Sequence, residues 1–141
     1  MKNEIHLEFC IWGFDDISHE EISKTLGIKP SKIYVKGEPV NPKFPLKKAS
    51  KNGWRMRIEE DAYASFENQM DKMLDVIEQK KALFEIFCSK YYCEFSCALF
   101  IRYNNGESTP WIHLTSRYNE LVKKLNIEFD FDIYCLPKES L

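Results

Sequence analysis

The chain has 141 residues, of which 44% are apolar and 30% are charged, and its formal net charge is −2 at pH 7. This length fits a single folded domain over residues 1–141, and the composition excludes fibrous and disordered classes. The longest apolar run, at 97–101, is far too short to cross a membrane, so no contact with a membrane is expected.

Two features predict a cytoplasmic protein. Glu4 and Glu8 carry charge in the N-terminal region, where a secretion signal needs an apolar stretch. The cysteines are odd in number, which favours reduced thiols over a disulfide framework. These five residues are Cys10, Cys88, Cys93, Cys97 and Cys135.

The N-terminal part predicts a strand and then a helix. Apolar and polar residues alternate over 4–12, the pattern of a half-buried strand. Ser18 and Glu21 are spaced as a capping box, which marks the start of a helix, and Gly27 ends that helix.

The following residues predict two strands on either side of a long loop. The strands are expected at 32–37 and 54–59, where apolar and polar side chains again alternate. The intervening loop, 38–53, contains three prolines and ends in a glycine.

The middle of the chain predicts a long helix, a break and a shorter helical turn. Apolar residues recur at helical spacing over 66–77, so this face of the helix is expected in the core. The pattern falters at 79–81 and resumes at 83–87.

The C-terminal third predicts two strands, a helix and a last strand. An aromatic-rich alternating stretch at 91–103 is followed by a turn signal at 104–106. We expect a second strand at 111–115, an amphipathic helix over 118–125 and a final strand at 128–135.

The predicted order of elements is βαββαββαβ, and its first six elements match the ferredoxin-like order. We therefore expect an α+β fold, a two-layer sandwich in which a largely antiparallel sheet carries its helices on one face. No linker or internal repeat interrupts the chain.

Three stretches, WGFDDISHEEISKTLGIKPSKIYVKGEP, a later NGW and the terminal DFDIY, together resemble the bacterial domain-of-unknown-function 4279 (DUF4279) family, over nearly the whole chain. The residues that carry the resemblance are Gly13, Ile22, Leu26, Gly27, Ile28, Pro30, Gly37, Trp54, Asp132, Ile133 and Tyr134. The resemblance implies no catalytic residue. Because some family members sit beside polymorphic toxins, it implies an immunity-type role for part of the family.

The terminal FDFDIYC raises the question of a paired-carboxylate site. On a strand, Asp130 and Asp132 share one face with Cα atoms about 6.6 Å apart, a separation that a hydrolase could use. Any half-exposed strand has the same appearance, and no substrate-binding signature accompanies the pair. A hydrolase is therefore only the third hypothesis, and an enzyme is less favoured than a binding domain.

Metal, cofactor and nucleophile sites are not predicted. Cys93 and Cys97 lie on one predicted strand, where four residues span about 13 Å, too far for both sulfurs to bind one ion. The same spacing separates His6 from Cys10, so this strand alone cannot pair a nucleophile with its base. The five glycines never cluster into a phosphate-binding loop, and no cofactor is expected.

Charge is distributed unevenly along the chain. Residues 29–57 contain nine basic side chains and one acidic side chain, a net charge of +8. The remainder carries −10. One part of the protein should therefore attract anions, and the rest should attract cations or basic partners.

The acidic part supports the first functional hypothesis, a non-enzymatic protein-binding domain, in particular an immunity protein that neutralises a cognate toxin. Its candidate partner-binding residues are Asp15, Asp16, Glu59, Glu60, Asp61 and Asp132. A basic partner, such as a nuclease-type toxin, would be steered to such a patch.

The basic part supports the alternative, binding of nucleic acid or another anionic ligand through 29–57. Its candidate residues are Lys43, Lys47, Lys48, Lys51, Arg55 and Arg57. Aromatic residues are interleaved with these cations, as in proteins that bind single-stranded nucleic acid. A sequence pI of about 6.0 makes nucleic acid the less favoured partner.

Overall fold

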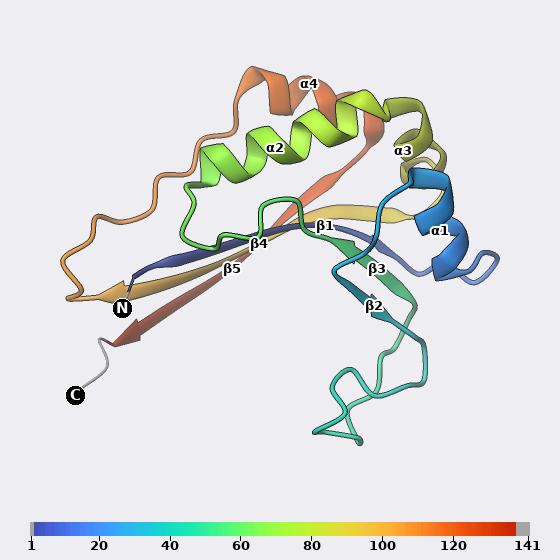
Figure 1. Ribbon diagram of the computed structural model, residues 1–141, viewed down its shortest axis with the longest axis horizontal. Coiled ribbons are helices and arrows are strands. Elements are labelled where there is room, and N and C mark those ends of the chain that lie inside the picture. The colour runs from blue at the N-terminus through green and yellow to red at the C-terminus, as the bar shows by residue number, and fades with distance from the viewer. Residues whose placement is uncertain (1, 138–141) are drawn as a thin grey trace.

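The computed structural model describes residues 2–137, and within them it contains five strands and four helices (Figure 1). In chain order, these are β1 (Glu4–Trp12), α1 (His19–Leu26), β2 (Lys32–Tyr34), β3 (Gly53–Met56), α2 (Phe66–Gln79), α3 (Lys81–Cys88), β4 (Tyr92–Tyr103), α4 (Ser116–Leu125) and β5 (Glu128–Pro137).

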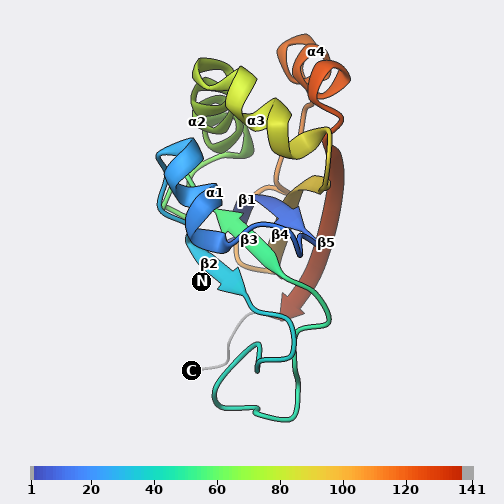
Figure 2. The ribbon, with the colours of Figure 1, turned by 90° about the vertical axis from the view of Figure 1, so that its right-hand side faces the viewer.

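The strands form one sheet in the order β2-β3-β1-β4-β5. The first four strands are antiparallel to their neighbours and have the ferredoxin-like order, while β5 is added beside β4 in parallel. The helices lie on one face of the sheet (Figures 1 and 2). The predicted α+β class and its two layers are therefore confirmed.

The strand expected at 111–115 does not form, so the order of elements differs from the prediction there. The edge of β4 that such a strand would need is occupied by β5, which pairs with β4 from Glu94 to Tyr103. Residues 111–115 instead run as extended chain towards α4, with the rings of Trp111 and His113 stacked on each other 5.4 Å apart. Alternation predicts which side chains share a face, but it does not provide a neighbouring strand.

The core fills the space between the sheet and the helices. The apolar residues of β1 and β4 that point to this side are buried, including Leu7, Phe9 and Phe95. Phe9 lies edge-on to Phe84 of α3, with ring centroids 5.3 Å apart. The break expected near 79–81 is real, because α2 ends at Gln79 and α3 begins two residues later.

The buried side chain of Gln69 joins α2 to β1 where β3 no longer reaches. Its amide oxygen accepts from the backbone N–H of Leu7 at 3.1 Å, and its amide nitrogen donates to the carbonyl of Ile5 at 2.9 Å. The same nitrogen donates to the carbonyl of Ala64 at 2.9 Å. One glutamine thus replaces a strand partner for this part of β1.

Candidate functional site

The face of the sheet opposite the helices is open to solvent, and its side chains are largely polar, charged or aromatic. They come from every strand, because alternation places each second residue on this side. The pairing register arranges these side chains in rows across the strands. One row contains Trp12, Tyr34 and Tyr92, the next contains Lys32, Arg55, Cys10 and Glu94, and a third contains Glu8, Ser96 and Asp130. We call this surface the open face.

A close approach at Gly53 brings two rings of the open face together. Trp12 of β1 and Tyr34 of β2 pair with Gly53 from either side, and their ring centroids are 5.0 Å apart. A Cβ atom at Gly53 would lie 2.4 Å from the Trp12 ring and 3.0 Å from the Tyr34 ring. The absence of a side chain at this position is what allows the two rings to meet.

Cations lie over these rings. The ammonium group of Lys51 is 5.5 Å from the centroid of Trp12 and 5.9 Å from that of Tyr92. Lys32 and Arg55 lie 4.8 Å and 5.4 Å from the centroid of Tyr34. Such contacts are attractive, and they hold flexible cationic side chains in defined places on the open face.

Two arginines of the same surface share one carboxylate. Arg57 donates to the Glu8 carboxylate at 3.2 Å, and Arg55 lies 3.5 Å from the same oxygen. Ser31 donates to the other oxygen of Glu8 at 3.2 Å. These residues and Lys32 line a shallow cavity of about 350 Å³. We call the four cations Lys32, Lys51, Arg55 and Arg57 the cationic zone.

The loop between β2 and β3 extends the cationic zone. Lys47, Lys48 and Lys51 line a second cavity of about 290 Å³ together with Trp12 and Tyr34. The loop is closed by backbone bonds, including Gly37 N–H to Ala49 at 2.9 Å and Val40 N–H to Lys47 at 3.0 Å.

The structure thus gathers most of the predicted anion-binding set at one place. Lys47, Lys48, Lys51, Arg55 and Arg57 line the two cavities of the open face. Lys43 lies further along the loop, beside the exposed ring of Phe44.

At the opposite edge of the sheet the open face is acidic. Glu128, Asp130 and Asp132 alternate along β5, and all three are exposed. We call them the acidic strip. Asp130 and Asp132 are the paired carboxylates of FDFDIYC, and their neighbours on β4 are Ser96 and Ala98, so the pair lies on the exposed face of an edge strand.

The predicted acidic partner-binding set is spread over three places. Asp15 and Asp16 follow the end of β1, where Lys90 and Tyr91 donate to Asp16, and the Lys90 hydrogen bond lowers the pKa of that carboxyl. Residues 59–61 lie beside the start of β1, because the Ile5 N–H donates to Ala62.

Within the second of these places, Lys72 donates to Glu59 and lowers the pKa of its carboxyl. Glu60 faces the cavity of the cationic zone, next to Arg57. Asp132 is two strands away from β1, on β5. These residues therefore do not form one continuous patch, and Asp132 belongs to the acidic strip.

Two buried thiols of the sheet, those of Cys10 and Cys97, are protonated at neutral pH. Burial raises the pKa of Cys10 to about 12, although Arg55 next to it acts in the opposite direction. Burial likewise raises the pKa of Cys97 to about 12. Burial lowers the pKa of His6, and Arg57 lowers it further. A thiol with so high a pKa is a poor nucleophile, so Cys10 and His6 do not form an activated pair.

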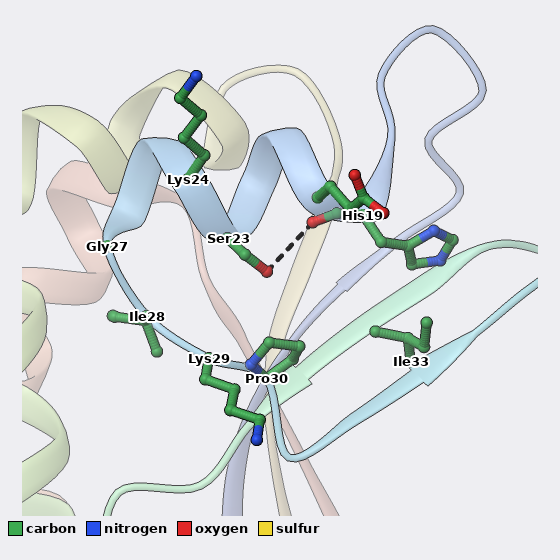
Figure 3. A pocket seen from close by; sticks show the side chains of 9 residues that line it. His19, Ser23, Lys24, Gly27, Ile28, Lys29, Pro30 and Ile33 are labelled. Atoms are coloured by element: carbon green, nitrogen blue, oxygen red, sulfur yellow. Dashed lines mark hydrogen bonds between the residues drawn. The ribbon is translucent and has the colours of Figure 1, made fainter.

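A separate apolar hollow of about 590 Å³ lies between α1 and β2 (Figure 3). The side chains of Ser23 and His19, which line it, already bond within the protein. Ser23 donates to the His19 carbonyl at 3.2 Å and accepts from the Trp54 indole at 3.0 Å. A ring nitrogen of His19 lies 2.8 Å from the Tyr34 carbonyl. These bonds hold α1 against the sheet, which is a structural role.

Sequence reasoning missed three members of the open face, namely Glu8, Trp12 and Tyr92, whereas Lys32 and Tyr34 lie within the predicted basic segment 29–57. Alternation alone places Trp12 and Glu8 on the face of β1 away from the core. The missing information was the register that brings this face beside Tyr34 and Arg55, residues far away in the sequence.

Comparison with known proteins identifies the family of the chain. A family model described as a domain of unknown function, DUF4279, matches residues 3–136. The chain belongs to this DUF4279 family. No curated protein and no solved structure matches it significantly. Membership in DUF4279 confirms the resemblance and adds no activity, so function has to be argued from the open face.

Among the residues that the structure describes, no helix combines the length and apolar character that a membrane crossing requires.

Proposed function

We propose that this protein is a non-enzymatic binding domain for a protein partner and that it binds through the open face of its sheet. The observation that carries the proposal is the separation of charge on that face. The cationic zone lies on β2, β3 and the adjoining loop, whereas the acidic strip lies on β5, at the other edge of the sheet.

A protein can supply charges of both signs to such a surface, whereas a nucleic acid would be repelled by the acidic strip. Complementary charge mainly accelerates association and selects the correct partner. Two aromatic side chains between the zones, Trp12 and Tyr92, and a third beyond the acidic strip on β5, Tyr134, add the ring surface that protein interfaces favour.

The finer proposal is an immunity protein whose partner is a toxin in the same bacterial cytoplasm. It is supported by the resemblance to a family with members beside polymorphic toxins and by the acidic strip, which suits a basic toxin. The domain would neutralise its partner by covering that basic surface, and no chemical step by this chain is required.

The proposal is tested by recovering the tagged full chain from its native cells at moderate salt after nuclease treatment. We expect a single stoichiometric protein partner. With that partner, the double variants Asp130→Lys/Asp132→Lys and Lys32→Glu/Lys51→Glu should each reduce the association rate about tenfold, because each reverses one zone.

Matched controls carry the same charge changes on the helical side, Glu85→Lys/Glu120→Lys and Lys123→Glu/Lys124→Glu, where the original side chains are exposed. These controls should leave the association rate nearly unchanged. If open-face and control variants behave alike, the partner binds elsewhere and the proposal is wrong.

A second candidate, binding of an anionic ligand in the cationic zone, is favoured by one observation. Among residues 2–137, the guanidinium groups of Arg55 and Arg57 share one carboxylate, that of Glu8, so most of their donors have no acidic partner there. The Nε atoms of Arg55 and Arg57 are buried without a hydrogen-bond partner within the described part of the chain. Unpaired buried donors of this kind call for an acceptor such as an anion.

This candidate predicts that single-stranded DNA binds with a steep dependence on salt. Replacing Lys43, Lys47, Lys48 and Lys51 with serine should weaken binding and flatten the salt dependence, because fewer counterions are released. The measurement is a titration of labelled oligonucleotide at 50 and 200 mM salt. If neither salt nor the serine substitutions change the affinity, the lysines of the loop and Lys51 of the cationic zone do not bind the anion.

A further inference from the structure

The strand β5 has an unusually long free edge for a sheet of this size. It is the last strand in the sheet order, and within the described part of the chain it pairs on one side only, with β4. It has 10 residues, compared with three in β2 at the other edge. A strand edge carries a row of backbone donors and acceptors ready to pair with another strand, and proteins usually shorten or cover such edges.

The helices cover only the beginning of β5. The ring of Phe129 packs against Phe95 and Tyr118 in the core. Further along the same side of the strand, Phe131 is 41% exposed and Ile133 is 61% exposed. In Figure 1 this end of β5 runs away from the helices, below α2 and α4. The free edge is therefore accompanied by exposed apolar side chains on the helical side.

The other side of the same strand carries the acidic strip, Glu128, Asp130 and Asp132. A second copy of this chain is therefore a poor occupant of the edge. In a symmetric pairing of two β5 strands, the acidic strips of both copies would lie on one face as neighbours. Like charges on adjacent strands destabilise the pairing.

We propose that the free edge of β5 accepts an extended segment of a protein partner in which basic and apolar residues alternate. The basic side chains would lie beside Asp130 and Asp132 on the open face. The apolar side chains would cover Phe131 and Ile133 on the helical side. Backbone bonds to the edge supply affinity, and the alternating side chains supply specificity.

This inference rests on the proposed function, since it names how the protein partner is held. It also answers the question raised by FDFDIYC. Asp130 and Asp132 discourage pairing between copies of the chain, and they select a basic strand in place of an uncharged one.

The first test uses a labelled ten-residue peptide that alternates lysine with valine, capped at both ends, and the full chain. We expect saturable binding by fluorescence anisotropy, together with slower hydrogen exchange of backbone amides within β5. A peptide of the same composition, with five lysines followed by five valines, keeps the charge and loses the alternation. It should bind at least tenfold more weakly and leave exchange in β5 unchanged.

The second test exchanges the charges. The variant Asp130→Lys/Asp132→Lys should lose affinity for the lysine–valine peptide at least tenfold and gain affinity for a glutamate–valine peptide. The control Glu85→Lys/Glu120→Lys makes the same change in net charge on α3 and α4 and should retain the original preference. The substitution Ile133→Ala alters an exposed side chain. It should weaken binding of the lysine–valine peptide to the wild type, and of the glutamate–valine peptide to the Asp130→Lys/Asp132→Lys variant, severalfold in each case.

The inference is overturned if the two lysine–valine peptides bind equally well, or if binding leaves β5 amides unprotected. The experiments distinguish a failure of this inference from a failure of the proposed function on which it rests. A native partner that binds without slowing exchange in β5 would sustain the proposed function and contradict this inference. If no protein partner is recovered but the alternating peptide binds at β5, the proposed function is contradicted and the peptide-binding property of the β5 edge is sustained.

Discussion

At the scale of single residues, Gly53 has the clearest consequence for the open face. Its backbone has an ordinary conformation, so the need for glycine is steric and does not come from a left-handed φ angle. The rings of Trp12 and Tyr34 occupy the space that a Cβ atom would need. A methyl group there has to push the Trp12 ring away from Tyr34 and from the ammonium group of Lys51.

We therefore expect Gly53→Ala to destabilise the fold by about 1–3 kcal/mol, the usual cost of overpacking. Urea denaturation measures this change. The double variant Gly53→Ala/Trp12→Leu removes most of the clash, so the alanine should cost less in that background than in the wild type. An equal cost in the two backgrounds would mean that the Trp12 ring is not what constrains Gly53.

At the scale of elements, the attachment of α2 to β1 depends on a polar side chain. The strand β3 pairs with β1 only from Phe9 to Trp12, so no strand of the described residues 2–137 lies on that side of the first half of β1. Gln69 supplies the missing donor and acceptor from the first turns of α2, and it is only 2% exposed. Burying a backbone donor or acceptor without a hydrogen-bond partner lowers the free energy of unfolding. The amide of Gln69 prevents that loss at Ile5 and Leu7.

The substitution Gln69→Leu should lower the free energy of unfolding by about 3 kcal/mol, because it leaves the N–H of Leu7 and the carbonyl of Ile5 unpaired. Thermal or urea unfolding provides the measurement. Gln79→Leu makes the same change at an exposed position of the same helix and should be nearly neutral. Similar losses at both positions would show that helix propensity, and not the bonds to β1, accounts for the effect.

At the scale of the whole molecule, β5 combines two roles. Its first half completes the core, where Phe129 contacts Phe66, Phe95 and Tyr118. Its second half projects past the helices with Ile133 exposed. The parallel β4–β5 pair therefore joins the packed ferredoxin-like unit to the free edge of β5, where a partner could bind.

This division predicts different costs for two truncations along one strand. Phe129→Ala should destabilise the fold by about 3 kcal/mol, because it removes a ring from a packed aromatic cluster. Ile133→Ala should change stability by less than about 0.5 kcal/mol, as is typical of exposed positions. Both are measured by urea denaturation of the full chain. A large loss at Ile133 would mean that this end of β5 is packed in solution, and the free edge would then be covered.

Much of the local structure and the family could be predicted from sequence. Alternation in β1 and β4, the capping box of Ser18 with Glu21, and the break after Gln79 all depend on neighbouring residues, and all are confirmed. The candidate site was predicted only in part. The basic segment was recognised by charge, whereas Glu8 and Trp12 were missed because their partners come from other strands.

By itself, the sequence determined which side chains share a face of each element, where the helices start and stop, and that charge is unevenly distributed. Those properties follow from backbone geometry over a few residues. Only the tertiary structure decided which strands are neighbours. That decision brought Trp12, Tyr34 and Lys51 together over Gly53, separated Asp16 from Glu59, and placed β5 beside β4 while 111–115 forms no strand. Pairing between distant strands depends on how the whole core is filled, and no local pattern encodes it.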